Sequence, residues 1–266
     1  MSSPKLVPPP PETLSPPPAA ENLTRVYVWQ LPVRMAHWVI VLSIAVLSVT
    51  GYYIYQPFLS ARGDAAFTMA RMRYLHELAA WCFLSAVLVR LYWFFRGNRW
   101  AHWRSFLPLQ AWWRRGFRKQ LRYYLFLERD PDSKVGHNPL AAATYLVVFG
   151  VMAVEIATGL ALFNHIVDSP VLGWFVNWIP DAIPIRYVRE IHFLILFVFL
   201  AFMIHHVYSA VLIGIEERSG LMDGIFSGFK FFPAAFVASD PVRGPQDAPV
   251  LAAGRSQWRG QPEARP

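Results

Sequence analysis

Long uncharged stretches alternate along this chain with shorter segments that hold most of its charged residues. About 20 consecutive apolar residues suffice to cross a bilayer core of about 30 Å as an α-helix. Four stretches are long enough, and the pattern predicts membrane-spanning helices over about 35–55, 75–95, 140–163 and 191–213. The predicted fold class is therefore an all-α membrane protein built on a four-transmembrane-helix bundle.

The segments around these spans differ in composition. Residues 1–24 include the proline-rich run PPPPETLSPPP, and residues 233–266 form a polar, proline-containing tail, so both are predicted to be disordered. The domain between them, 25–232, holds the four spans and one long basic connection, 96–138. Aromatic and basic residues interleave over 112–124 of that connection, which predicts an amphipathic helix in the headgroup region of a membrane.

Composition and charge agree with a membrane protein. Of 266 residues, 55% are hydrophobic and 16% are charged, whereas about a quarter of an ordinary soluble domain is charged. The net charge is +8, and in so apolar a chain a basic excess is expected beside membrane lipids rather than on nucleic acid. The connection 96–138 has ten Lys and Arg residues against five in the other two connections, so the positive-inside rule places it and both termini in the cytoplasm. We therefore expect a multi-pass protein of a bacterial inner membrane.

Histidines stand near the ends of three predicted spans. His192 and His206 are fourteen residues apart, a spacing that returns to within roughly 40° of the same helix face and separates them by about 21 Å along the axis. His37 begins the first span and His76 begins the second. Because consecutive spans run in opposite directions, His37 is expected at the depth of His206 and His76 at the depth of His192. The pattern predicts two histidine pairs at two depths of the membrane.

Two facing imidazoles suit one kind of cofactor. A pair of neutral histidines from neighbouring helices makes a six-coordinate haem iron site, which favours electron transfer. The single cysteine, Cys82, excludes a disulfide within the chain, a Cys-rich iron–sulfur or zinc site, and covalent haem attachment through Cys-x-x-Cys-His. We therefore predict two non-covalent b-type haems whose axial ligands are His37, His76, His192 and His206.

The remaining histidines are not predicted to be ligands. A lone histidine at the end of a span is more often an interfacial hydrogen-bonding residue, and agreement in depth is what favours the four named above. His205 is turned roughly 140° away from the face of His192. His102, His137 and His165 lie in connections or at their edges and are interpreted as surface residues.

Four charged residues in or beside the spans have other expected roles. Arg34 and Arg73 each precede a histidine by three positions, where they either contact haem propionates or anchor the span at the interface. Arg90, near the exit of the second span, is interpreted as reaching to the interface. Glu155 lies in mid-span, where an unpaired carboxylate is costly, so we expect either a role in proton movement or a buried hydrogen bond.

Several short motifs give the sequence from about 27 to 231 a resemblance to a known family. They are Arg34-x-x-His37-Trp38 and Thr50-Gly51 in the first span, Arg73 before His76, Gly97-Asn98-Arg99 after the second span, Gly136-His137-Asn138-Pro139 before the third, and His206-Val207-Tyr208 in the fourth. Together they resemble the b-type cytochrome subunit of membrane-bound NiFe hydrogenases. The chain departs from that pattern at Ile191-His192, where many members have Trp-His, which leaves the hydrogenase subgroup open.

The resemblance implies a four-helix diheme cytochrome that anchors the large and small subunits of a periplasmic hydrogenase and passes electrons from hydrogen to quinone. The family's ligand positions carry over to His37, His76, His192 and His206. The chain itself is then an electron-transfer subunit, since the hydrogen-activating site lies on other chains. Two alternatives stay open. One is a diheme cytochrome of another partner, such as formate dehydrogenase or thiosulfate reductase, or one that acts alone as a quinol oxidase-type cytochrome. The other is a haem-free transporter or assembly protein in which histidines and Glu155 relay protons.

Overall fold

The computed structural model describes residues 23–58, 67–217 and 219–242. Most of the arm and most of the tail that are predicted to be disordered lie outside these residues. Four long helices dominate the described chain, namely α1 (Leu31–Tyr55), α2 (Thr68–Arg96), α4 (Pro139–Val167) and α7 (Ile185–Glu217). Each is long and apolar enough to cross a membrane, so the prediction of four spans is confirmed.

The helices extend further than the hydropathy pattern predicts. α2 begins at Thr68 instead of about 75, and α7 begins at Ile185 instead of 191. The added turns of both helices carry basic residues, which lower the local hydropathy. Hydropathy marks the part of a helix that lies in hydrocarbon, whereas its backbone hydrogen bonds continue into the polar boundary.

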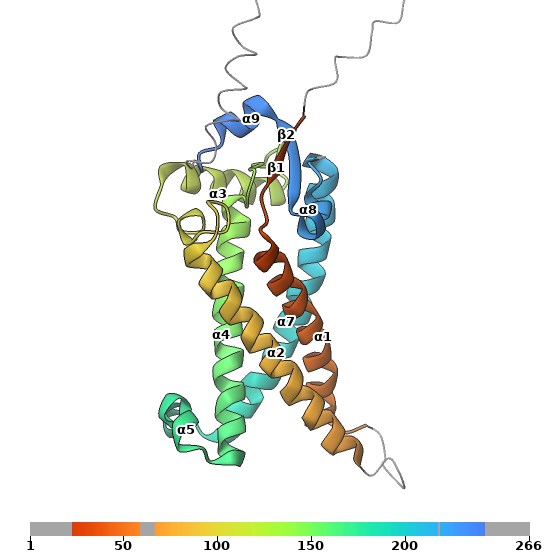
Figure 1. Ribbon diagram of the computed structural model, residues 1–266, viewed down its shortest axis with the longest axis vertical. Coiled ribbons are helices and arrows are strands. Elements are labelled where there is room, and N and C mark those ends of the chain that lie inside the picture. Colours follow the sequence, from red (N-terminus) through yellow and green to blue (C-terminus); the bar gives the residue numbers. More distant parts are fainter. Residues whose placement is uncertain (1–22, 59–66, 218, 243–266) are drawn as a thin grey trace, which may run out of the picture.

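Two helix pairs make up the bundle. α1 packs along α2, and α4 packs along α7. Figure 1 shows α3 (Ala111–Tyr124) and α8 (Leu221–Ser227) at one end of the bundle together with two short strands, and α5 (Pro170–Val176) at the opposite end. We call these ends the sheet end and the α5 end. α3 forms over the segment where an amphipathic helix is predicted, and α6 (Trp178–Ala182) leads from α5 into α7.

A two-stranded antiparallel sheet closes the sheet end, and the all-α prediction missed it. β1 (Leu23–Tyr27) pairs with β2 (Phe229–Pro233), and α9 (Ala234–Ser239) follows within the segment predicted to be a disordered tail. Buried side chains of these three elements pack in one cluster with side chains from the segments that precede α1 and α4. The cluster includes Val26, Val28, Trp29, Val135, Phe232 and Val237. The two strands lie near the two ends of the described chain, so their pairing is a long-range contact that local sequence patterns do not reveal.

Polar contacts fasten the spans to this sheet. Lys230 of β2 is 1% exposed, and its Nζ lies 3.7 Å from Oε2 of Glu217 at the end of α7. Burial lowers the pKa of Lys230, and the Glu217 carboxylate partly offsets that effect. Gln30, just before α1, accepts hydrogen bonds from the Trp93 ring at 2.9 Å and from the backbone N–H of Asn98 at 2.8 Å. These contacts hold the ends of α1, α2 and α7 against one another.

Apolar side chains fill the middle of the bundle. All four spans contribute to one buried cluster there, made of Ile40, Phe83, Ala86, Val87, Met152, Ile195 and Phe199. A second cluster joins α4, α5, α6 and α7 at the α5 end through Ala161, Val176, Ile179 and Val188. The predicted ligand histidines lie on either side of the mid-bundle cluster along the bundle axis.

Candidate functional site

The structure brings the four predicted ligand histidines together in two pairs. The ring centres of His37 and His206 are 6.3 Å apart, and those of His76 and His192 are also 6.3 Å apart. A metal–imidazole bond is about 2 Å long and a ring centre lies about 1.1 Å beyond its nitrogen, so imidazoles on opposite sides of one metal have centres about 6.2 Å apart. Both pairs have this separation.

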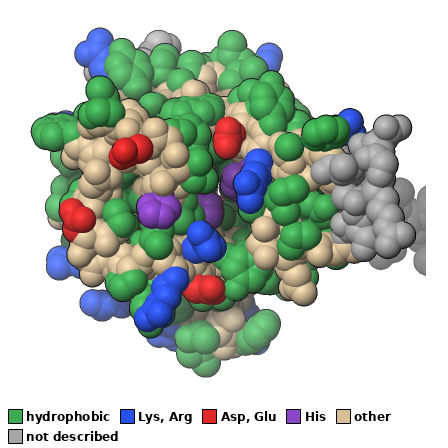
Figure 2. All heavy atoms as spheres, turned by 90° about the horizontal axis from the view of Figure 1, so that it is seen from below, with side chains coloured by type: hydrophobic (Ala, Val, Ile, Leu, Met, Phe, Trp, Pro, Cys, Tyr) green, Lys and Arg blue, Asp and Glu red, His purple; other side chains and the backbone are tan. Residues whose placement is uncertain are grey.

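The pairs lie at opposite ends of the bundle. His37, on the first turns of α1, meets His206 of α7 near the sheet end. His76 of α2 meets His192 of α7 near the α5 end, and Figure 2 shows histidine side chains on this end of the molecule among hydrophobic and charged ones. Since α7 supplies one member of each pair, the fourteen residues between its two histidines set the distance between the sites at about 21 Å along the helix.

A threonine holds each imidazole at the α5 end. Oγ1 of Thr50 lies 2.9 Å from Nδ1 of His76, and Oγ1 of Thr158 lies 3.1 Å from Nδ1 of His192. Each hydroxyl donates its hydrogen to the backbone carbonyl four residues earlier in its helix, at 2.7 and 2.8 Å respectively. The hydroxyl oxygen is then an acceptor for Nδ1–H, which leaves the lone pair of Nε2 free for a metal.

A glycine next to each threonine lets the imidazole approach the helix. A Cβ at Gly51 would lie 3.2 Å from Cε1 of His76, and a Cβ at Gly159 would lie 3.1 Å from Cε1 of His192. Both distances are closer than ordinary van der Waals contact, so any side chain at either glycine would press on the ring. The Thr50-Gly51 motif was recognised in the sequence, whereas Thr158-Gly159 was missed although it repeats the same dipeptide.

Glu155 lies beside the same site. Its Oε2 is 3.3 Å from Nδ1 of His192 and has no hydrogen-bond partner among the described residues. Both residues are partly buried, with 19% and 22% of their side chains exposed. The mid-span carboxylate thus contacts a predicted ligand, whereas His76 makes no ion pair with an Asp or Glu among the described residues.

The pair at the sheet end has different neighbours. The His206 ring stacks on Phe202 with centres 5.5 Å apart, and Nδ1 of His37 has no hydrogen-bond partner among the described residues. Arg34 donates from Nη1 to the backbone carbonyl of Phe226. His205 instead lies 3.4 Å from the Ser209 hydroxyl through Nε2, on another side of α7. The structure therefore brings His206, and not its neighbour, to His37.

Two residues interpreted as exposed are in fact enclosed. Arg90 was expected to reach the interface but is 4% exposed, because it continues the buried face of α2 that includes Phe83 and Val87. His137 was expected at the surface but packs against the rings of Trp29 and Phe106, with centres 4.7 and 5.4 Å away. The residues around a position near the end of a span are the same whether its side chain points outward or inward. The hydropathy pattern therefore did not distinguish the two orientations.

The Gly-His-Asn-Pro motif explains how His137 is placed. A Cβ at Gly136 would lie 2.8 Å from Cδ1 of Trp100, so the backbone passes directly over that indole ring. Asn138 caps α4 by accepting the backbone N–H of Ala141 at 2.8 Å, and Pro139 is the first residue of the helix. The motif therefore starts α4 and turns the intervening imidazole into the bundle.

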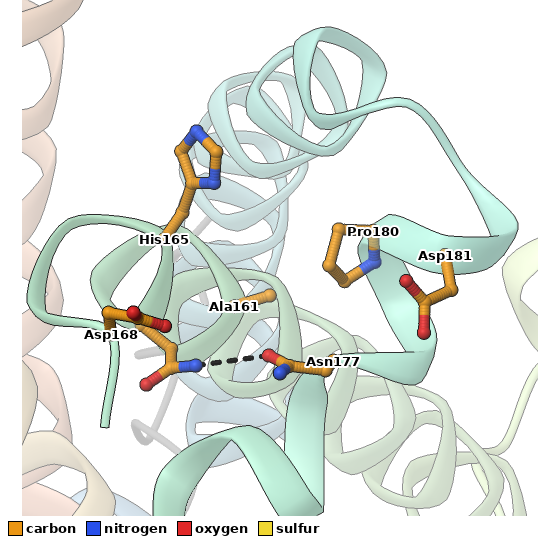
Figure 3. Close-up of a pocket in the computed structure, with 7 residues that line it drawn as sticks. Ala161, His165, Asp168, Asn177, Pro180 and Asp181 are labelled. Atoms are coloured by element: carbon orange, nitrogen blue, oxygen red, sulfur yellow. Dashed lines mark hydrogen bonds between the residues drawn. The ribbon is translucent and has the colours of Figure 1, made fainter. Parts of the chain in front are cut away.

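Other predicted residues stay outside the two pairs. Arg73 is exposed on α2, and His102 is partly buried before a short 3-10 turn at Trp103–Ser105. His165 is exposed at the α5 end, where it lines a cavity of about 280 Å³ with Asp168 and Asp181. In Figure 3 these side chains surround the cavity beside the hydrogen bond from Asn164 to Asn177. No group of three or more metal-binding side chains is found there or elsewhere in the described residues.

Comparison with known proteins accounts for this arrangement. A model of the prokaryotic cytochrome b561 family matches residues 28–228. The chain belongs to this family. As a b-type cytochrome of the membrane it binds b-type haem, and it carries electrons rather than catalysing a reaction on a substrate of its own. The paired imidazoles at both ends, and the glycines beside the pair at the α5 end, fit that group.

Curated relatives within the cytochrome family cover nearly the same region. A protein of Escherichia coli strain K12 is 32% identical over 229 residues, which is 79% of this chain and 93% of that protein. Proteins of Rhodobacter capsulatus and Bradyrhizobium diazoefficiens are 34% and 35% identical and cover 79% and 78% of this chain, and 82% and 86% of their own lengths. All three are named as probable B-type cytochrome subunits of a Ni/Fe-hydrogenase.

Replacing Gly159 by valine is expected to remove one haem from the cytochrome. The added side chain would displace the His192 ring, which already lies within 3.1 Å of where the Cβ would be. If the chain holds the two predicted haems, haem content per chain, measured after purification, should fall by about half. Gly150→Val is the matched control on the same helix, because no atom lies within 4 Å of its Cβ position. Equal haem content in both variants would contradict the assignment of His192.

Proposed function

We propose that this cytochrome is a diheme electron-transfer subunit that anchors a periplasmic NiFe hydrogenase to the bacterial inner membrane and delivers electrons from hydrogen to the quinone pool. One observation carries the proposal: two histidine pairs, each with ring centres 6.3 Å apart, at opposite ends of one four-helix bundle. A single pair would serve a local redox site. Two pairs separated across the bilayer suit a path that carries electrons from one membrane surface toward the other.

The proposed orientation puts the sheet end in the cytoplasm. The basic connection 96–138, with its ten Lys and Arg residues, joins α2 to α4 at that end. Both described chain ends lie there as well (Figure 1). The α5 end then faces the periplasm, where the large and small hydrogenase subunits would be bound.

The residues of the α5 end would receive electrons first. His76 and His192 would hold haem iron there, which supplies one-electron reduction and oxidation when bound. Thr50 and Thr158 orient the two imidazoles by accepting from Nδ1. Glu155 places a carboxyl group 3.3 Å from Nδ1 of His192, where it would accept a hydrogen bond from that imidazole or take part in proton movement beside the site.

The residues of the sheet end would pass electrons to quinone. His37 and His206, which lie beyond the apolar mid-bundle cluster, would hold the second haem. The basic connection and α3 lie at the same end of the bundle, and the ring centre of Tyr124 on α3 is 6.5 Å from that of His205 (Figure 1). There they would shape a quinone pocket and admit protons from the cytoplasm. Reduction of quinone at this side consumes protons there, so oxidation of hydrogen at the other side would contribute to the membrane potential.

Co-purification and reduction by hydrogen test the proposal together. When a tagged full-length chain is solubilised from membranes of its own host and purified, both hydrogenase subunits are expected to co-purify with it. Adding hydrogen to that complex should reduce its b-type haem, whereas formate and thiosulfate should have no effect on the haem spectrum. Purification with a formate dehydrogenase or a thiosulfate reductase instead would assign the chain to that oxidoreductase.

Replacing His205 and His206 separately tests which of these adjacent histidines on α7 is the haem ligand. His205→Ala is expected to keep both haems, because His205 contacts Ser209 and not His37. His206→Ala should keep one haem, because its ring is the one that faces His37. Haem content and the reduced-minus-oxidised spectrum of the two purified variants decide between them, and the reverse result would refute the assignment on α7.

A further inference from the structure

A buried arginine on α2 faces the interior of the bundle near the sheet end. Only 4% of Arg90 is exposed, and its guanidinium carbon lies 4.9 Å from the ring centre of Tyr145 and 5.9 Å from that of Phe106. Nη1 and Nη2 of Arg90 have no hydrogen-bond partner among the described residues. The side chain thus holds a positive charge and two donor nitrogens without partners beside two aromatic rings.

Two further polar groups beside Arg90 are also without partners in the described part of the chain. They are the Tyr145 hydroxyl and Nδ1 of His137, on rings whose centres are 5.8 Å apart. Burial, together with the nearby charges of Arg90, Lys230 and His206, lowers the pKa of His137 to about 3. His137 is therefore a neutral imidazole with one N–H.

The packing of α1 against α2 places Arg90 near the depth of His37. Gln30 contacts Trp93 and Thr50 contacts His76, so the two helices run antiparallel and His37 lies within about one helical turn of the level of Arg90.

The charge of Arg90 calls for an anion. Contact with two aromatic rings stabilises a guanidinium less than burial without a counter-ion destabilises it. Among the residues that the structure describes, no Asp or Glu forms an ion pair with Arg90. A neutral carbonyl would satisfy the hydrogen bonds and leave the charge uncompensated, whereas a carboxylate satisfies both and matches the guanidinium fork.

We propose that Arg90, Tyr145 and His137 form a buried anion-binding site that receives a propionate carboxylate of the haem held by His37 and His206. The proposal rests on the function given above. This site differs from the propionate contacts expected for Arg34 and Arg73. Arg34 donates to a backbone carbonyl, and Arg73 is exposed. An acidic phospholipid offers the same anionic oxygen chemistry through its phosphate, and the experiment separates the two sources.

A redox titration of the full-length protein carrying Arg90→Gln tests the site. Without the positive charge the propionate is uncompensated and stabilises ferric iron, so one midpoint potential should fall. We expect about a tenfold shift in the ferric–ferrous equilibrium, which is about 59 mV for one electron. The haem affected should be the one missing from His206→Ala. Arg96→Gln removes the same charge from an exposed position at the end of α2 and should leave both potentials unchanged.

A second experiment changes the haem instead of the protein, so its main comparison does not depend on whether a variant folds. The unaltered full-length chain is loaded with haem or with haem dimethyl ester, whose propionates carry no charge. With the ester, the charge of Arg90 is uncompensated, and the same midpoint potential should rise. Combining the ester with Arg90→Gln removes both charges and should return the potential close to its original value.

The outcomes separate this inference from the proposed function. Two haems with potentials that neither Arg90→Gln nor the ester changes would overturn the propionate site and leave the diheme function intact. If Arg90→Gln left both potentials unchanged but removed a co-purifying acidic phospholipid, the anion would be that lipid. If Arg90→Gln left both potentials unchanged but raised the KM for quinone, the cluster would bind quinone instead. Absence of haem from the unaltered chain would overturn the proposed function itself.

Discussion

Replacing His206 by alanine is expected to reduce electron transfer from hydrogen to quinone to background while leaving hydrogen oxidation with a periplasmic artificial dye nearly unchanged. In the proposed path, electrons reach the site of His76 and His192 first and then cross about 21 Å, less the extent of the haem rings, to the site of His37 and His206. The dye takes electrons before this crossing and quinone takes them after it. Loss of the second haem therefore interrupts only the quinone route.

Both activities are measured in one membrane preparation of the His206→Ala variant. His205→Ala is the matched control, because it removes an adjacent imidazole that does not face His37. It should preserve both activities. If His206→Ala lacked one haem and still reduced quinone at the original rate, the quinone site would lie on the periplasmic side and the proposed direction of transfer would be wrong.

Alanine at His76 and alanine at His192 are expected to cause the same loss. Each residue supplies one imidazole of the pair at the α5 end, and a b-type haem with one of its two axial ligands removed is not held in a six-coordinate site. Each variant should therefore retain about one of the two haems, and the haem that remains should have the same spectrum and midpoint potential in both.

His165→Ala is the control for the α5 end, because His165 is an exposed histidine at that end and belongs to neither pair. It should keep both haems. If His76→Ala matched His206→Ala in the spectrum of the remaining haem, while His192→Ala did not, the pairing seen in the structure would not be the pairing of the ligands.

The positions of the four histidines were predictable because two independent regularities act on them. Hydropathy gives the depth of each residue in the membrane, and the helix period gives the face on which it lies. The fourteen-residue spacing on α7 satisfies both, so the sequence alone matches His192 and His206 with His76 and His37. The structure places these rings opposite one another at both ends.

The surroundings of the histidines were less predictable. Thr158 and Gly159 hold His192 from another helix, and only the repeat of the Thr50-Gly51 dipeptide signals this role in the sequence. Arg90 turns inward on the buried face of α2, and His137 turns inward because the connection before α4 folds over Trp100. Such orientations follow from packing between distant segments, and hydropathy carries no information about them.

The small sheet was missed for the same reason. β1 and β2 are five residues long each, and neither has an adjacent strand in the sequence to suggest a hairpin. Their pairing buries Val26 and Phe232 against Val237 of α9. This long-range burial also explains why structure continues past the point where the predicted disordered tail begins.

The haem content of the purified full-length chain tests the central claim most directly. The claim is that one chain holds two b-type haems, one at each histidine pair. A pyridine haemochrome assay combined with quantitation of the protein should give two haems for each chain, and a redox titration should resolve two one-electron steps. One haem for each chain, or none, would contradict the proposed electron path through the membrane.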